Sequence, residues 1–143
     1  MIKSFKGEHA WLSNFAPCVV QCDQHFTYPT VEHAYQASKT LDADDRKIIA
    51  GASTAGKAKR WGREVIMQPG WNAMRVEVMD VILRQKFIQH PFAQLLVDTD
   101  EQELIEGNNW GDVFWGQVNG SGHNYLGRLI MSLRKELTDE VVL

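Results

Sequence analysis

The stretch that decides the fold is residues 28–40, Tyr28-Pro-Thr-Val-Glu-His-Ala-Tyr-Gln-Ala-Ser-Lys-Thr40. Pro29 favours an extended chain before it, because the residue preceding a proline avoids the helical conformation. Thr30 is a good N-cap residue. The following residues, 31–40, contain neither glycine nor proline, so we expect them to form a helix.

On that helix Glu32, Gln36 and Lys39 lie at positions i, i+4 and i+7, which places all three on one face. Such a stripe is often only a solvated ion-pair face. Here three amphipathic side chains crowd the same segment: Tyr28, His33 and Tyr35. Their presence favours a functional face over a plain surface helix.

Composition sets the class of protein. With 143 residues and 44% hydrophobic residues, we expect one globular domain over residues 1–143. The net charge of −3 argues against a broad, non-specific nucleic-acid surface. The N-terminus lacks a signal-peptide core and no long apolar run follows, so we expect a soluble, cytoplasmic protein without a membrane partner. Cys18 and Cys22 would lie roughly 13 Å apart on a strand, which predicts two free thiols.

Secondary structure follows from the patterns on either side. Residues 19–27 suggest a short β-hairpin that turns at Asp23 and Gln24, with its second strand at 25–27. A helix capped by Asp42 or Asp44 should end at Gly51. A basic segment opens at Ser53. We expect the longest helix at 71–89, a short helix near 92–96, an extended piece at 103–107 and a loop at 108–124.

Two stripes indicate core packing. Met74, Val78 and Ile82 are spaced by four residues on the 71–89 helix, with Trp71 and Met79 alongside. The last helix carries a leucine-rich stripe, with its cations expected on the opposite face. The stripe residues are Leu126, Leu129, Ile130, Leu133 and Leu137, and the cations are Arg128, Arg134 and Lys135. Together these elements predict a mainly α fold, compact and multi-helical, with a small β element near the N-terminus.

Two further segments carry candidate functional groups. The basic segment holds Lys57, Lys59, Arg60 and Arg63 around Trp61, which fits either a solvated face or a phosphate site. The 108–124 loop mixes glycine and asparagine with three aromatic residues. A long irregular loop in a compact domain is usually functional or disordered, and its aromatic content argues against disorder.

The motifs of several common enzyme classes are missing. There is no Cys-x-x-Cys pair, no His-Glu-x-x-His sequence, no phosphate-binding loop, no dinucleotide fingerprint and no serine nucleophile elbow. We therefore expect no metal and no cofactor. The remaining chemistry is that of Glu32, Lys39 and Asp112. These groups suit acid–base catalysis at an acetal-like carbon, which suggests a hydrolase with a sugar- or nucleotide-like ligand.

Six blocks in order resemble the NADAR family, also called YbiA-like. They are Ser13-Asn14-Phe15, residues 28–39, residues 58–63 (Ala-Lys-Arg-Trp-Gly-Arg), Val78-Met79 with Lys86-Phe87, residues 112–116 (Asp-Val-Phe-Trp-Gly) and residues 124–131 (Asn-Tyr-Leu-Gly-Arg-Leu-Ile-Met). The resemblance runs from about residue 11 to 137. It departs at Thr40, where many relatives carry Phe, and in the loop before Asp112, which bears on the substrate more than on the reaction.

The resemblance implies a mainly helical N-glycosidase that splits bonds between ribose C1 and an amine. Its substrate would be a phosphorylated ribosylaminopyrimidine of the riboflavin pathway, or ADP-ribose attached to guanine in a nucleotide or nucleic acid. On this basis the catalytic residues would be Glu32, Lys39 and Asp112. The substrate-binding residues would be Asn14, Tyr35, Gln36, Arg60, Arg63, Trp71, Trp115, Gly116 and Asn124.

Within that class each group has an expected role. Lys39 could form a Schiff base at C1 if its surroundings lower its pKa, while Glu32 moves protons. Arg60 or Arg63 would meet a phosphate, and Trp71 or Trp115 would stack on the base. Two other classes remain open. A binding module for ADP-ribose would use the same Trp and Arg residues without needing Glu32 and Lys39 together, and a purely structural protein would leave the 108–124 loop unexplained.

Overall fold

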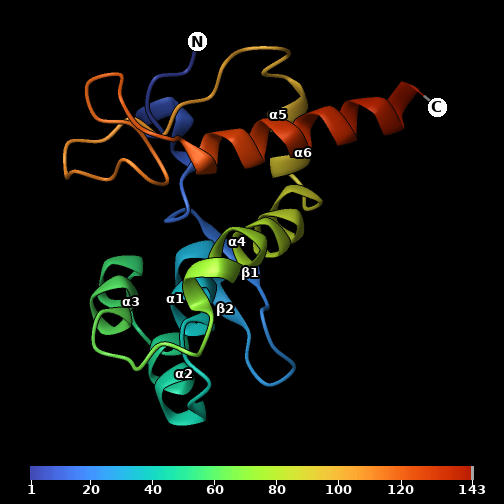
Figure 1. The fold of residues 1–143 in the computed structure, drawn as a ribbon. Coiled ribbons are helices and arrows are strands. Elements are labelled where there is room, and N and C mark those ends of the chain that lie inside the picture. The colour runs from blue at the N-terminus through green and yellow to red at the C-terminus, as the bar shows by residue number, and fades with distance from the viewer. Residues whose placement is uncertain (143) are drawn as a thin grey trace. The chain divides into compact units, whose positions relative to one another are not determined.

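The chain is described by a computed structural model that covers residues 1–142, with side chains described for residues 1–139; the last residue of the expected 1–143 domain lies outside this range. Most of the regular structure is helical, with one two-stranded sheet, which confirms the expected mainly α fold with a small β element near the N-terminus (Figure 1). The elements are η1 (Gly7–Leu12), β1 (Pro17–Val20), β2 (Tyr28–Thr30), α1 (Val31–Ser38), α2 (Ala43–Ala50), α3 (Ala55–Gly62), α4 (Trp71–Phe87), α5 (Phe92–Val97) and α6 (Tyr125–Val142).

The chain folds as two compact units. The first, Asn14–Lys86, contains the sheet and helices α1 to α3 with nearly all of α4. The second joins Met1–Ser13 to the residues from Phe87 onward, and contains η1, α5 and α6.

Helix α1 begins where the sequence predicts but ends at Ser38 rather than at Thr40. The side chain of Thr30 accepts a hydrogen bond from the backbone N–H of His33 at 3.1 Å, which satisfies one of the free donors at the helix start. At the other end Gln68 donates its backbone N–H to the carbonyl of Lys39 at 2.6 Å and its side-chain amide to that of Ser38 at 2.7 Å. All eight residues of α1 are buried. Helices α2 and α3 lie beside α1, and also contact each other (Figure 1).

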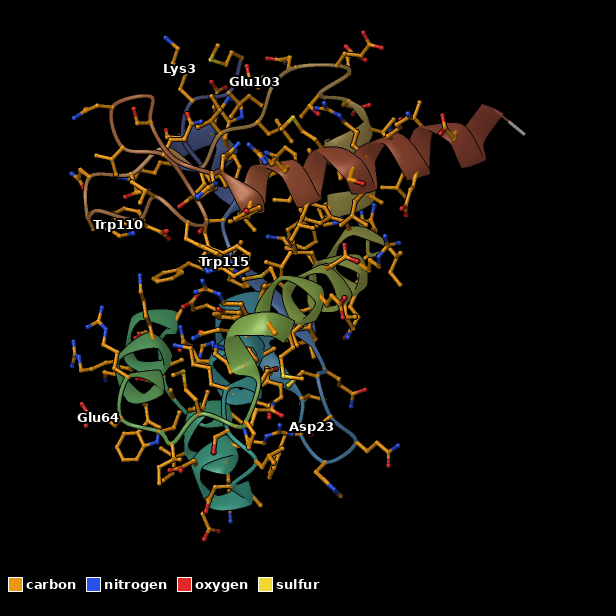
Figure 2. The ribbon with its side chains drawn as sticks, in the orientation of Figure 1. Lys3, Asp23, Glu64, Glu103, Trp110 and Trp115 are labelled. Carbon is orange, nitrogen blue, oxygen red and sulfur yellow. The ribbon has the colours of Figure 1, made fainter. Side chains whose placement is uncertain are left out.

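The hairpin exists, but its second strand is not where we expected it. Strand β1 pairs antiparallel with β2 at Tyr28–Thr30, rather than with residues 25–27. The cause is Asp23, whose carboxylate accepts the backbone N–H groups of His25 at 2.8 Å and Phe26 at 2.9 Å. These bonds hold both residues in a turn, so they are not available to the strand ladder. Figure 2 shows Asp23 on the loop of this hairpin.

Local capping signals also fix α2 and α3. Asp42 accepts the N–H of Asp45 at 2.9 Å and Gly51 follows α2 directly, both as predicted. Helix α3 is capped by Thr54, which accepts the N–H of Lys57 at 3.1 Å. The two cysteines, Cys18 and Cys22, are free thiols, as expected.

Helix α4 buries part of the stripe that we predicted. Trp71, Met79 and Ile82 are buried as expected, but Met74 and Val78 are only partly covered. The buried positions are Trp71, Met79, Ile82, Leu83, Lys86 and Phe87. A spacing of four residues drifts around a helix of 3.6 residues per turn, so the core face follows steps of three and four instead. Helix α4 has 17 residues and is shorter than α6, which has 18, so it is not the longest helix.

The second unit combines extended segments with α5 and α6. Ile2 pairs with Leu104 and Gly107 with Gln117 in isolated bridges, which confirms an extended piece at residues 103–107. Figure 2 shows Lys3 and Glu103 on these neighbouring segments. Residues 108–124 form the expected irregular loop.

Helix α6 buries Leu126, Ile130 and Leu133 as predicted, but it also buries Arg134, which we expected on the exposed face. The guanidinium of Arg134 donates to Thr99 Oγ1 at 2.8 Å. Thr99 follows α5 (Phe92–Val97), and α5 packs against α6. The binary pattern of α6 alone does not show that this neighbour covers its charged side. Within the described chain, no helix is both long and apolar enough to span a bilayer.

Candidate active site

Helix α1 carries three of the predicted site residues in a setting that excludes a solvated ion-pair face. Glu32 is 8% exposed and Gln36 is 4% exposed, and the rest of the helix is buried with them. Lys39 follows the last helical residue and is partly covered. Burying an ionisable carboxylate is costly unless other groups replace its water. The burial of Glu32 therefore favours a functional role that offsets the free energy needed to bury its carboxylate.

Glu32 is held by two hydrogen bonds within the same unit. Its backbone N–H donates to the carbonyl of Asn14 at 3.1 Å, which ties the start of α1 to the segment before β1. Its Oε1 accepts from the side-chain amide of Gln36, one helical turn later, at 2.8 Å. A neutral donor fixes the direction of the carboxylate without cancelling its charge.

The two residues that bond to Glu32 each carry a buried side-chain acceptor without a partner among the described residues. They are Asn14 Oδ1 and Gln36 Oε1. Asn14 is 8% exposed, and its amide nitrogen lies 3.6 Å from the sulfur of Met79. A buried acceptor without a donor costs about 1–3 kcal/mol, so such groups call for an explanation in a native protein. Both oxygens are suited to accept from hydroxyl or amine donors of a ligand.

Lys39 has the depressed pKa that a nucleophilic amine requires. Burial lowers the pKa of Lys39 most, the charge of Glu32 opposes this shift, and the cations Arg63, Lys59 and Arg75 lower it further. Its ammonium nitrogen lies 5.8 Å from the centroid of the Tyr35 ring. A role for Lys39 as a nucleophile requires a lowered pKa, and the pKa of Lys39 is shifted in that direction.

Tyr35 and Trp71 form an aromatic wall next to Lys39. Their ring centroids are 5.4 Å apart and their planes meet at 51°. Tyr35 is 6% exposed and Trp71 is 3% exposed. In this state Trp71 packs on a protein ring, and its stacking on a base stays a prediction.

The basic segment separates into two parts. Arg63 and Lys59 lie close enough to Lys39 to lower its pKa, whereas Arg60 is not among the causes of that shift. Arg63 follows the end of α3, where the chain is exposed. Of the two arginines that we expected near a phosphate, Arg63 is the one whose charge acts on Lys39, and contact of either with a phosphate stays a prediction. We did not predict Arg75 as a residue near Lys39. Its place one helical turn after Trp71, on a half-buried helix, is the signal in the sequence that could have indicated it.

The second unit holds the remaining predicted residues. Asp112 Oδ1 accepts the backbone N–H groups of Phe114 at 3.0 Å and Trp115 at 2.9 Å, so this oxygen orders the loop. The Phe114 ring packs at 4.8 Å from the rings of both Trp115 and Tyr125. Figure 2 shows Trp110 and Trp115 on this irregular segment. The catalytic role of Asp112, and its common pocket with Glu32, Lys39 and Trp115, stay predictions.

Gly116 and Asn124 have structural tasks in the same unit. A Cβ atom on Gly116 would overlap the carbonyl oxygen of Glu106. Asn124 adopts a left-handed conformation with φ of 54°, accepts from the N–H of Glu106 at 2.9 Å and donates to the carbonyl of Leu104 at 2.9 Å. Both atoms of its amide are thus used to brace the loop, and contact of either residue with a substrate stays a prediction. Among the described side chains, no group of three or more His, Cys, Asp or Glu could hold a metal ion.

Comparison with known proteins identifies the family. Residues 2–138 match the NADAR domain, which covers almost the whole chain. The chain belongs to the NADAR domain family. This confirms the resemblance seen in the sequence blocks.

Relatives in the NADAR family fall into two groups by length. The N-glycosidase YbiA of Shigella flexneri serotype 5b is 37% identical over 141 residues, which span 96% of this chain and 87% of that protein. The N-glycosidase Npun_R5314 of Nostoc punctiforme is 33% identical over 132 residues, 87% of this chain and 83% of that protein. The riboflavin biosynthesis protein VVA0006 of Vibrio vulnificus is 38% identical over 135 residues, but these span 92% of this chain and only 36% of that protein.

A solved NADAR structure has the same fold. The NMR structure of the Escherichia coli protein YbiA superposes with a TM-score of 0.84 and 35% sequence identity, over 99% of this chain and 85% of that one. The expected YbiA-like architecture is therefore confirmed. The expected enzyme class, a hydrolase acting on N-glycosyl bonds, is confirmed by the relatives of similar length.

Proposed function

We propose that this chain hydrolyses the bond between ribose C1 and an exocyclic amine of a phosphorylated ribosylamine. Glu32 acts as general acid and base, and Lys39 acts as the nucleophile. The observation that carries the proposal is the buried Glu32 carboxylate next to Lys39, whose pKa is lowered. Acid–base groups with perturbed pKa values are typical of active sites.

The reaction can be written from these two side chains. When the ring oxygen of the ribosylamine takes a proton from Glu32, the sugar opens to an iminium ion at C1. The neutral amine of Lys39 adds to C1, the leaving nitrogen takes a proton, and the free amine departs to leave a Schiff base on Lys39. Water then adds to C1, Glu32 accepts its proton, and the C1–lysine bond breaks to release the sugar aldehyde and the lysine amine.

Substrate binding is supported by the cations and acceptors around these groups. Arg63, Lys59 and Arg75 place positive charge near Lys39, which suits a phosphate on the sugar. Asn14 Oδ1 and Gln36 Oε1 can accept from ribose hydroxyls.

Two further roles are proposed from the family resemblance. Asp112 would orient the ribose, and Trp115 or Trp71 would stack on the base. No residue in this scheme requires a metal or a cofactor.

The substrate class is proposed to be a ribosylaminopyrimidine phosphate or an ADP-ribosylated guanine. Relatives in Vibrio vulnificus and Zea mays are named riboflavin biosynthesis proteins, which supports the first. Removal of ADP-ribose and a cytoplasmic location stay predictions. We also propose that the two compact units work as one domain, because the family match at residues 2–138 runs through both.

Incubation of the protein with each substrate, followed by chromatography of the products, tests this proposal. We expect free base or pyrimidine amine and free sugar phosphate from at least one substrate. Glu32→Gln keeps the shape of the side chain but cannot transfer a proton, so turnover should fall by about 10²–10⁴-fold while substrate still binds. Binding of ADP-ribose without release of base from either substrate would instead identify a non-catalytic binding module.

A further inference from the structure

Helix α3 packs against α1, and Gly62 lies against Gln36 of α1. Ala55, Ala58 and Gly62 are the buried residues of α3, so this helix presents its small side chains to the interior of the unit. A Cβ atom added to Gly62 would overlap Oε1 of Gln36, and would lie 2.7 Å from Cδ and 3.1 Å from Cβ of the same side chain. The amide of Gln36 therefore fills the space that a methyl group on residue 62 would need.

Backbone conformation does not explain this glycine. Gly62 is helical, and its φ lies outside the left-handed region that favours glycine. Gly62 is the last residue of α3, so a left-handed conformation is not the reason for a glycine at this helix end. Its position against one side chain indicates that the space itself is needed.

The side chain that occupies this space orients Glu32. Gln36 donates its amide to Glu32 Oε1 at 2.8 Å, while its own Oε1 is buried without a partner among the described residues. A methyl group at position 62 would meet the flexible end of Gln36 rather than backbone, so the fold could yield by moving the amide. That movement would break the hydrogen bond to Glu32.

We propose that Gly62 is a positioning residue that holds the Gln36 amide on Glu32. This inference rests on the proposed function, because it concerns the carboxylate assigned there as acid and base. Gly62 sets the position of the amide, the amide donates to the carboxylate, and the donated hydrogen bond favours the ionised form of Glu32. Gly62 itself touches neither the substrate nor the reacting atoms.

The chain offers a matched control on the same helix. Gly56 is also in α3, and a Cβ atom there would meet only Thr54 Oγ1 at 3.9 Å, an ordinary contact. Gly62→Ala and Gly56→Ala make the same chemical change in the same helix. Only Gly62→Ala displaces the Gln36 amide.

The test measures kcat, KM and their pH dependence for both glycine variants, for Gln36→Ala and for the double variant Gln36→Ala with Gly62→Ala. Gly62→Ala should lower kcat roughly tenfold or more, the scale of one hydrogen bond to a charged group, with KM changed less. Because Glu32 starts the reaction protonated, the alkaline limb that it sets should move to higher pH. Gly56→Ala should behave as the wild type. Gly62→Ala should add little once Gln36 is alanine, because the collisions with Oε1 and Cδ are gone and only the 3.1 Å contact with Cβ remains.

A second readout separates this inference from the proposed reaction. The ¹³C signal of the Glu32 carboxyl, titrated by NMR, should have its midpoint at higher pH in Gly62→Ala than in Gly56→Ala. Equal midpoints and equal kcat values in these two variants would overturn the positioning role, and so would an undiminished effect of Gly62→Ala on the Gln36→Ala background. If Gly62→Ala fails to fold, the double variant should fold; a double variant that also fails would refute the inference. Wild-type protein inactive on both substrates would sink the proposed function, while the titration would still decide the role of Gly62.

Discussion

Lys86 should make the stability of this protein rise between pH 8 and pH 10. It is fully buried in α4, and burial, partly opposed by the nearby Cys18, lowers its pKa from 10.5 to about 8. Between these two values the unfolded chain keeps a proton that the folded chain has released. The free energy of unfolding therefore increases with pH in this window, by up to about 1.4 kcal/mol per pH unit.

The expected magnitude follows from the two pKa values. From pH 7.5 to pH 9.5, the wild type should gain about 2 kcal/mol of stability from Lys86 relative to a variant that cannot titrate. Lys86→Met keeps a long unbranched side chain and removes the charge. Urea unfolding of both proteins at the two pH values gives the four free energies needed. Subtracting the two free energies at each pH cancels the contributions of groups that titrate equally in both proteins.

Cys18 supplies the control for this measurement. Because its charge contributes to the pKa of Lys86, the same pair of proteins should also be measured with Cys18→Ala. The pH-dependent gain should persist there. If the wild type and Lys86→Met differ by the same free energy at pH 7.5 and 9.5, the buried amine does not lose its proton in the folded state, and the reasoning is wrong.

Three further predictions concern the site and its support. Borohydride added during turnover should trap a sugar adduct on Lys39 and none on Lys39→Arg; near-normal turnover of that variant would show that water attacks C1 directly, with Lys39 only a charge nearby. Arg63→Ala should raise KM for a phosphorylated substrate about tenfold with little change in kcat, and more than Arg60→Ala does; equal KM values for the two variants would remove Arg63 from the phosphate site. Asp23→Asn should cost about 2 kcal/mol near pH 7, because the carboxylate accepts from Arg46 at 3.2 Å. Burial raises the pKa of Asp23, but its hydrogen bonds outweigh burial and lower this pKa from 3.8. The stabilisation by the ionised carboxylate is therefore present above pH 3.8 and is lost as the pH falls below that value. An unfolding free energy of Asp23→Asn equal to that of the wild type at pH 7 would contradict this prediction.

Local signals in the sequence predicted the helices well. Thr30 and Asp42 each cap a helix through a hydrogen bond to a residue three positions later, and Gly51 ends α2 where it was expected. Such bonds depend only on neighbours in the chain, so the sequence contains all the information they need.

Long-range contacts account for what the sequence analysis missed. Arg134 looked exposed on its own helix, yet Thr99 and the end of α5 cover it. The second strand was placed too early because the bonds made by Asp23 hold the loop before it. Neither fact follows from a residue's nearest neighbours in sequence.

The candidate site shows the same division. The shared face of Glu32, Gln36 and Lys39 follows from helical spacing, and was predicted. The position of Arg75 and the burial of the whole of α1 were not predicted, because they depend on how α3 and α4 pack. Spacing identified which side chains share a face, while their electrostatic surroundings required the folded unit.

The complete burial of α1 sets where this protein can change during evolution or in the laboratory. Each of its eight residues is buried, so a substitution there disturbs packing and chemistry together. By contrast, Asn109 and Trp110 on the 108–124 loop are exposed and can vary without disturbing a core. A library that seeks a new leaving amine should therefore keep α1 constant and diversify these exposed positions, where variants will keep their fold often enough for a change of specificity to be selected.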